Sequence, residues 1–355
     1  MTSPTVFPEL VVSRDGAAGV ILLNRPKAIN ALTLNMISLI DEALDALEAD
    51  PAIAVIILEG AGERGLCAGA DIRTLHDNAV AGGDFGRTFF GEEYRLNVRI
   101  AELAKPYVAF MDGVVMGGGV GLSSHARHRV VTERSKVAMP ETGLGFFPDV
   151  GGTWLLSRAP GELGTYLGLT GAVMSGADAV HCGFADTLIA SQSWPALREQ
   201  LTALTQGATQ ETVAALIRGC ATPASAPLAA RAGSINQAFA HDNVGAIFRA
   251  LEADGSEFAQ TTLRTMQAKS PRGLAVTLNL LRLARGSASL RECLIREFRA
   301  ALEVFASKDF IEGVRATIID RTHQPRWSPA RVEDVTAEII ARYLAPHGED
   351  LMFPA

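Results

Sequence analysis

The amino-acid sequence predicts an α/β fold that is followed by a helical C-terminal region. In the first part of the chain, short apolar runs of strand length alternate with glycine-rich turns and helical patterns, which is typical of α/β proteins. Beyond about residue 191 the strand signals almost vanish, and Ala, Leu, Glu and Arg dominate. We therefore expect an α/β core over residues 1–190 and a helical region over residues 191–355.

The first elements follow from local patterns. Residues 9–13 and 19–24 are apolar runs on either side of the Asp-Gly pair at positions 15–16, and this arrangement favours a β-hairpin. Thr33 is a suitable N-cap for a helix that continues to about residue 48 with apolar residues at helical spacing. Further apolar runs predict strands at residues 54–58, 107–111, 130–132 and 137–139.

Helix signals dominate the C-terminal region. The Ser-Pro pair at positions 270–271 predicts the start of a helix, and Gly286 predicts its end. Residues 289–319 predict a further helical stretch. Residues 222–230 are rich in Pro and Ala and are a candidate linker inside this region.

Composition excludes several classes of partner. The formal net charge is -7 and no stretch is densely basic, so we expect no nucleic-acid partner. No run approaches the roughly 18 apolar residues of a membrane span, and residues 1–10 resemble no targeting signal, so we expect a cytoplasmic protein without a membrane partner. The four cysteines lack metal-ligand spacing, and we expect reduced thiols: Cys67, Cys182, Cys220 and Cys293.

Three loops combine features that suit a ligand site. Residues 65–71 read GLCAGAD, and residues 117–119 are three glycines ahead of an apolar helix. Glycine lets the backbone approach a ligand, and N–H groups at a helix start are uncommitted. Residues 139–152 read MPETGLGFFPDVGG and place the carboxylates Glu141 and Asp149 in an apolar setting. The order and spacing of these loops predict a site more strongly than any one of them.

Together with residues 23–32, which read LNRPKAINAL, these loops resemble the motifs of the crotonase (enoyl-CoA hydratase/isomerase) superfamily over about residues 8–190. The resemblance implies a crotonase-like spiral of ββα units that binds an acyl-CoA. It also implies that the backbone N–H groups of Ala70 and Gly118 form an oxyanion hole for the thioester oxygen. The residues that it places along the substrate are Lys27, Ala28, Ala68, Asp71, Ile72 and Gly117.

Branches of this superfamily differ in their acids. Hydratases carry one Glu shortly after the glycines, where this chain has Gly121, and a second Glu at the position of Glu141. The combination of Glu141 with Asp149 resembles the 3-hydroxyisobutyryl-CoA hydrolases, and so does the segment SKDFIEGVRA at residues 307–316. This resemblance implies that both acids are catalytic in hydrolysing a short-chain 3-hydroxyacyl-CoA thioester in valine degradation. The alternative is an enoyl-CoA or dienoyl-CoA isomerase or hydratase; dienoyl-CoA isomerases share both acids and add an Asp where this chain has Gly121.

The resemblance implies no cofactor and no metal, because CoA is part of the substrate. It leaves open whether water attacks the thioester directly or Glu141 first forms an anhydride. Superfamily members often form trimers or hexamers, and we expect a possible homo-oligomer. The long helical C-terminal region offers another way to cover the same surface, so a monomer stays open.

Two other interpretations compete. The segment GLCAG at residues 65–69 matches a nucleophile elbow with Cys67 in the place of serine, although its strand–elbow–helix context is poor. The histidines available to such a site are His125, His128, His181, His241 and His323. The second interpretation is a non-catalytic binding protein that keeps the fold. Some crotonase relatives bind RNA, but this acidic chain shows no basic face for that purpose.

Overall fold

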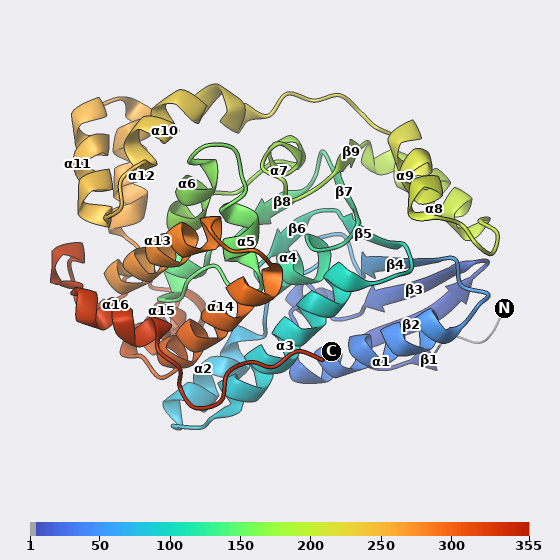
Figure 1. Cartoon of the computed structure of the whole chain (residues 1–355), viewed down its shortest axis with the longest axis horizontal. Helices are drawn as coiled ribbons and strands as arrows, with labels where there is room; N and C mark the ends of the chain where they lie inside the picture. The colour runs from blue at the N-terminus through green and yellow to red at the C-terminus, as the bar shows by residue number, and fades with distance from the viewer. Residues whose placement is uncertain (1–4, 355) are drawn as a thin grey trace. The chain divides into compact units, whose positions relative to one another are not determined.

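The computed structural model describes residues 5–354 (Figure 1). By their internal contacts these residues divide into two compact units. The first, here called the sheet unit, contains the described residues up to Ala70, then Arg95–Val137 and Met174–Pro227. The second, here called the helical unit, contains Asp71–Tyr94, Ala138–Val173 and the described residues from Leu228 onward. The chain passes between the units several times, whereas the sequence suggested one division near residue 190.

The sheet unit is built on a mixed seven-stranded sheet with the order β1-β2-β3-β4-β5-β7-β9. Its strands are β1 (Thr5–Val6), β2 (Leu10–Asp15), β3 (Ala18–Leu23), β4 (Val55–Gly60), β5 (Tyr107–Met111), β7 (His128–Thr132) and β9 (Thr187–Ile189). Neighbours from β1 to β3 are antiparallel, and neighbours from β3 to β9 are parallel. The predicted hairpin and the predicted strands near residues 54–58, 107–111 and 130–132 are confirmed.

Helices pack on both faces of this sheet. Side chains alternate between the faces along β3, and Ala18 and Val20 share an apolar cluster with α8 (Trp194–Thr202) and α9 (Gln210–Gly219). On the opposite face, α1 (Leu34–Ala49) lies so close to Gly19 that a Cβ there would be 2.4 Å from a methyl carbon of Leu47. The glycine at this position therefore permits the close approach of helix and strand.

Shorter elements complete the sheet unit. They are η1 (Pro26–Ala28), α4 (Gly118–Ser123), α7 (Gly176–His181) and η3 (Ser191–Ser193). β6 (Val114–Met116) pairs with β8 (Lys136–Ala138), so the strand predicted at residues 137–139 is present and begins one residue earlier. Thr33 caps α1 as predicted, because its side chain accepts a hydrogen bond from the Met36 N–H.

The helical unit contains most of the remaining elements (Figure 1). They are α2 (Ile72–Val80), η2 (Glu141–Leu144), α5 (Gly152–Leu156), α6 (Leu163–Thr170), α10 (Ala232–Phe239), α11 (Val244–Asp254), α12 (Glu257–Gln267), α13 (Pro271–Arg285), α14 (Leu290–Phe305), α15 (Lys308–Val314), η5 (Arg315–Ile319), η6 (Val332–Asp334) and α16 (Ala337–Leu344). Three elements include residues of both units: α3 (Phe85–Glu102), β8 and η4 (Pro227–Arg231). Within residues 5–354, no helix is both long and apolar enough to span a membrane.

The predicted C-terminal helices are present. Ser270 caps α13 through a hydrogen bond from the Gly273 N–H, and Gly286 follows the last residue of the helix. The helical stretch predicted for residues 289–319 is divided into α14, α15 and the π-helical turn η5. The division has a local cause, because Ser307 accepts a hydrogen bond from the Phe310 N–H and starts a new helix.

An aromatic cluster in the helical unit packs around the loop that carries Glu141 and Asp149. The rings of Phe146 and Phe147 are stacked with centroids 4.8 Å apart. Phe146 also contacts Phe90 and Phe310, with centroid distances of 5.6 and 5.8 Å. Both phenylalanines of the loop are buried, so the aromatic packing anchors the loop between its two acids.

Asn30 ties two loops of the sheet unit together. Its side chain is buried, and its amide nitrogen donates to the carbonyl oxygens of Ala61, Gly65 and Leu66 at 3.1, 3.3 and 3.0 Å. Its side-chain oxygen accepts from the Arg25 N–H at 2.9 Å. One amide therefore links the loop after β3 to the loop after β4.

We expect Asn30→Asp to lower the free energy of unfolding by about 3 kcal/mol. The aspartate keeps an acceptor for Arg25 but loses the two N–H donors that are shared among three carbonyl oxygens, and it brings a charge toward those oxygens. Urea unfolding followed by circular dichroism measures the change. Asn243→Asp is the matched control, because Asn243 is an exposed N-cap that uses only its side-chain oxygen. Equal stability of the two variants would contradict the role given to Asn30.

Candidate active site

The two loops expected to form the oxyanion hole lie side by side in the sheet unit. The Cys67 N–H donates to Val114 O at 3.1 Å, and the Met116 N–H donates to Cys67 O at 3.0 Å. Gly119 makes this pairing possible, because a Cβ at that position would lie 2.5 Å from Cys67 O. The backbones that lead to Ala70 and Gly118 are thus held together by their own hydrogen bonds.

The N–H groups of Ala70 and Gly118 are both uncommitted. Within the part of the chain that the structure describes, neither donates a hydrogen bond. Gly118 is the first residue of α4, where an N–H has no partner inside the helix. Gly69 precedes Ala70 with φ +108°, and a Cβ on it would lie 3.7 Å from the Gly118 nitrogen. The structure therefore brings the two predicted donors into one small region.

The two predicted acids meet in the helical unit. Glu141 begins η2, Asp149 lies just ahead of α5, and both carboxyl groups are buried. The Tyr94 hydroxyl, which comes from α3, donates to an Asp149 oxygen at 2.7 Å. Glu93, the neighbour of Tyr94, is also buried. The site thus contains a third carboxyl group and a tyrosine that the sequence analysis did not select.

Burial controls the protonation of this cluster. It raises the pKa of Asp149 to about 7, against the opposing effect of the hydrogen bond from Tyr94. It raises the pKa of Glu141 well above its usual range, and the nearby charges of Asp149 and Glu93 raise it further. The pKa of Glu93 is also raised well above its usual range, mainly by burial and further by the charge of Asp149. Such a group of acids cannot all be charged together, so it can hold a proton at neutral pH.

Lys269 provides a positive charge beside this loop. A Cβ on Gly143 would lie 3.2 Å from the Lys269 ammonium nitrogen. The positive charge opposes the rise in the pKa of Glu141, and burial lowers the pKa of Lys269 itself. Lys269 therefore favours the ionised form of Glu141.

Two carboxyl oxygens of the cluster have unused hydrogen-bonding capacity. Oε1 of Glu93 and Oε2 of Glu141 are buried and have no hydrogen-bond partner among the described residues. Buried polar atoms are rarely left in this state unless they serve a ligand, water or catalysis. These two oxygens are therefore the atoms of the cluster best suited to receive a substrate hydroxyl or a water molecule.

The remaining predicted substrate residues are distributed over both units. Lys27 and Ala28 form part of η1 and are exposed, and the next residue, Ile29, accepts a hydrogen bond from the N–H of Ala68 at 2.9 Å. Asp71 precedes α2, Ile72 begins it, and Gly117 precedes α4 with φ +49°. Their contacts with a substrate stay predictions.

Glu93 and Tyr94 lie outside the loop motifs, but their position in the sequence has a recognisable pattern. They follow Phe89 and Phe90 by four residues, so they lie on the same side of α3 as two buried rings. A glutamate on a buried helical face is unusual and favours a functional role. Lys269 had no comparable signal, because its proximity to residues 141–143 arises from tertiary packing.

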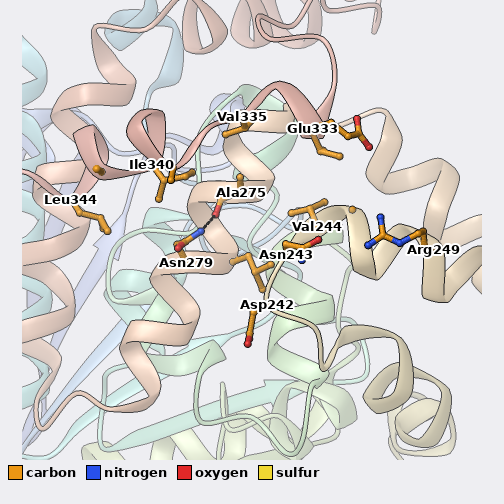
Figure 2. A pocket seen from close by; sticks show the side chains of 15 residues that line it. Asp242, Asn243, Val244, Arg249, Ala275, Asn279, Glu333, Val335, Ile340 and Leu344 are labelled. Atoms are coloured by element: carbon orange, nitrogen blue, oxygen red, sulfur yellow. Dashed lines mark hydrogen bonds between the residues drawn. The ribbon is translucent and has the colours of Figure 1, made fainter.

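A cavity of about 540 Å³ lies elsewhere in the helical unit, among α11, α13, η6 and α16 (Figure 2). Its wall is largely aliphatic, with polar groups from Asp242, Arg249, Asn279 and Glu333. The Asn279 side chain is turned back to Ala275, to whose oxygen it donates. None of the predicted site residues lines this cavity, so it is separate from the carboxyl cluster.

Fold and site together define a class of protein. The family model described as enoyl-CoA hydratase/isomerase matches residues 18–344, and the chain belongs to this family. The crotonase-type fold predicted from the sequence is confirmed by two similar structures. They are a carnitinyl-CoA dehydratase from Mycobacterium thermoresistibile (41% identity, TM-score 0.92, covering 98% of this chain and 99% of that one) and an enoyl-CoA hydratase from Rhodobacter sphaeroides 2.4.1 (41%, TM-score 0.89, 97% and 100%).

Curated relatives carry a more particular name. A protein of Xenopus tropicalis is 42% identical over 98% of this chain and 92% of its own length. A human protein is 40% identical over 97% of this chain and 91% of its own length. Both are named mitochondrial 3-hydroxyisobutyryl-CoA hydrolases. The cytoplasmic location expected from the sequence is therefore not confirmed.

The nucleophile-elbow interpretation is wrong. The chain has a crotonase-type fold, and Cys67 is completely buried in a loop that presents backbone N–H groups. Its sulfur lies 3.2 Å from Asn30 O, which suits a packed thiol better than a nucleophile. The interpretation as a non-catalytic scaffold is also not supported, because relatives of nearly the full length are named as enzymes.

We expect Glu141→Gln to stabilise the protein at pH 8 by about 2–6 °C in Tm and to have a smaller effect at pH 5. The pKa of Glu141 is raised by folding, so the unfolded chain releases the proton first as the pH rises and the folded state loses stability. Gln removes this loss, and Oε2 has no hydrogen bond to forfeit. Scanning calorimetry at both pH values measures the effect, with exposed Glu42→Gln as the control. A gain that does not depend on pH would contradict the argument.

Proposed function

We propose that this chain hydrolyses a short-chain 3-hydroxyacyl-CoA thioester, converting 3-hydroxyisobutyryl-CoA to 3-hydroxyisobutyrate and CoA. The observation that carries the proposal is that Glu141 and Asp149 are both buried and close enough for the charge of Asp149 to raise the pKa of Glu141, in a chain whose α4 provides no acid at Gly121. The names of the curated relatives support the same substrate. Valine degradation is the pathway to which this reaction belongs.

Hydration of a double bond is the competing function, since the similar solved structures are named as a dehydratase and a hydratase. In the hydratase pattern, two glutamates take part in adding water to the double bond. The first of them follows shortly after the three glycines at positions 117–119. Here that position is Gly121, which offers no proton-transfer group. Chemistry at the thioester carbonyl needs no acid there, because backbone N–H groups stabilise the charge that develops on oxygen.

The proposed reaction begins with the thioester oxygen bound by the N–H groups of Ala70 and Gly118. Water attacks the carbonyl carbon and loses a proton to the Glu141 carboxylate, or Glu141 attacks first and water then opens the resulting anhydride. In both routes the C–S bond breaks, CoA leaves as a thiolate, and the thiolate recovers a proton. Glu141 is required in either route.

Asp149 has a distinct role in this scheme. Tyr94 holds its carboxyl group, whose pKa of about 7 lets it accept or return a proton near neutral pH. We assign to it the orientation of the substrate hydroxyl or the water, with the proton shared with Glu141. The scheme needs no cofactor or metal. A cytoplasmic location and assembly into trimers or hexamers stay predictions.

The first test measures CoA release from 3-hydroxyisobutyryl-CoA, 3-hydroxypropionyl-CoA and crotonyl-CoA with a thiol reagent. We expect rapid release from both hydroxyacyl esters, an unchanged crotonyl double bond, and at least a hundredfold loss of kcat in Glu141→Gln. Loss of the double bond without CoA release would replace hydrolysis by hydration. Full hydrolysis by Glu141→Gln would remove both routes described above.

The oxyanion loops provide a second test. In Gly119→Ala the new methyl group would lie 2.5 Å from Cys67 O, so the paired loops must separate. Loss of one oxyanion donor typically lowers kcat by about 10² to 10³, and we expect a loss of that size. Gly233→Ala is the control, because Gly233 lies in α10 with no atom within 4 Å of an added Cβ. Circular dichroism checks that both variants are folded, and a folded, fully active Gly119→Ala would contradict the assignment.

A further inference from the structure

A fourth buried carboxyl group lies next to Asp149 in the chain's tertiary structure. Glu297 is on α14, and its side chain is completely buried within the helical unit. One of its oxygens accepts from the Gly151 N–H at 2.7 Å. The other accepts from the Thr153 N–H at 3.1 Å and from the Thr153 hydroxyl. Three donors from one short turn therefore converge on a single carboxylate.

The turn that Glu297 binds is conformationally demanding. Val150 has φ +51°, which is unfavourable for a β-branched residue, and Gly151 follows with φ +77°. A non-glycine residue in this region typically costs about 1–3 kcal/mol, so surrounding contacts must hold it. α5 begins directly afterwards at Gly152, and no side chain of its own N-cap accepts from it. Glu297, on the helix α14 far along the chain, instead accepts the hydrogen bonds of the Gly151 and Thr153 N–H groups.

The same turn determines where Asp149 lies. The Gly152 N–H donates to Asp149 O at 2.6 Å, so the backbone of Asp149 is part of the turn that Glu297 holds. Tyr94 restrains the other end of the residue through its carboxyl group. Asp149 is thus held at two points. The turn holds its backbone, and Tyr94 holds its carboxyl group.

We propose that Glu297 is a positioning residue for the hydrolysis, acting through the 149–153 turn on Asp149. The inference rests on the proposed function, in which Asp149 orients the hydroxyl or the water. A displacement of about 1 Å in such a group typically costs about a hundredfold in rate.

The chemistry of Glu297 agrees with a functional role. Burial, with a smaller contribution from the charge of Asp149, raises its pKa to about 7 against the opposing effect of the hydrogen bonds from Thr153 and Gly151. A carboxyl group whose pKa is raised by folding lowers the stability of the folded protein above its normal pKa. A residue needed only for packing would avoid this penalty, since an uncharged side chain fills the same space.

Two sets of variants separate positioning from packing. Glu297→Gln keeps the volume and one acceptor oxygen, but its NH₂ group opposes one of the backbone donors. Thr153→Val removes the hydroxyl donor and keeps the backbone N–H, and Thr153→Ser restores the hydroxyl. Melting temperatures accompany every rate measurement and report any general loss of folding.

The deciding experiment is a double-mutant cycle on CoA release with Glu297→Gln, Asp149→Asn and the pair. We expect Glu297→Gln to lower kcat about 10- to 100-fold with KM changed less than about threefold. In the Asp149→Asn background the same change is expected to cost less than about threefold, because Glu297 acts through Asp149. We expect Thr153→Val to lower kcat and Thr153→Ser to recover it.

Several outcomes would overturn the inference. One is a kcat for Glu297→Gln within twofold of the wild-type value. Another is a kcat of the double variant that falls by the product of the two single losses, because the two residues would then act independently. Failure of the proposed function is recognised separately, because wild-type protein would then release no CoA. Full activity of Asp149→Asn would remove the role of Asp149 and with it that of Glu297.

Discussion

Burial of the Asp149 carboxyl group is the constraint on which the rest of the helical unit depends. A carboxylate without water must be stabilised by hydrogen bonds or take up a proton. Here Tyr94 donates to its side chain, and the turn that carries it is held by Glu297. The aromatic rings of Phe146 and Phe147 exclude water from the same loop. The tight turn and the raised pKa of Asp149 both follow from the need to place an acid in this surrounding.

In the sheet unit, the predicted oxyanion-hole groups belong to the backbone alone. Its two uncommitted N–H groups, at Ala70 and Gly118, need only loops that run close together. Glycine at positions 69 and 119 allows that approach. The Asn30 side chain stabilises the loop that precedes Ala70 by donating a hydrogen bond to Leu66 O. Backbone N–H donors carry no charge that changes with pH, so the proposed reaction assigns its proton transfer to the acids of the helical unit.

The parts of the fold that were predictable from the sequence are those with local causes. The hairpin at β2–β3, the cap at Thr33 and the start of α13 at Ser270 are each determined by a few neighbouring residues. The division into two interleaved units was not predictable in this way. It depends on which distant helices pack together, and the pattern of apolar residues does not distinguish between possible partners.

The candidate site likewise contains residues that were predictable from the sequence and residues that were not. The four residues selected from loop motifs, Glu141, Asp149, Ala70 and Gly118, form two local groups in the structure. Glu93 had a recognisable signal on a buried helical face, but Glu297 and Lys269 come from segments more than 100 residues away. Their partners are chosen by tertiary packing. Motifs therefore identify the reacting groups better than the groups that support them.

Family membership alone does not decide between the two chemistries, because relatives named as hydrolases and as hydratases share similar identity with this chain. The placement of the acids is more informative than their number. The buried acids of the helical unit include Glu93, Glu141, Asp149 and Glu297, yet α4 contributes none. In the hydratase pattern an acid of α4 takes part in adding water to a double bond, whereas the proposed reaction uses only the N–H of Gly118 at the start of α4, which would bind the thioester oxygen. A helix that offers a donor and no acid favours attack on the thioester, and this asymmetry is the physical reason to prefer hydrolysis.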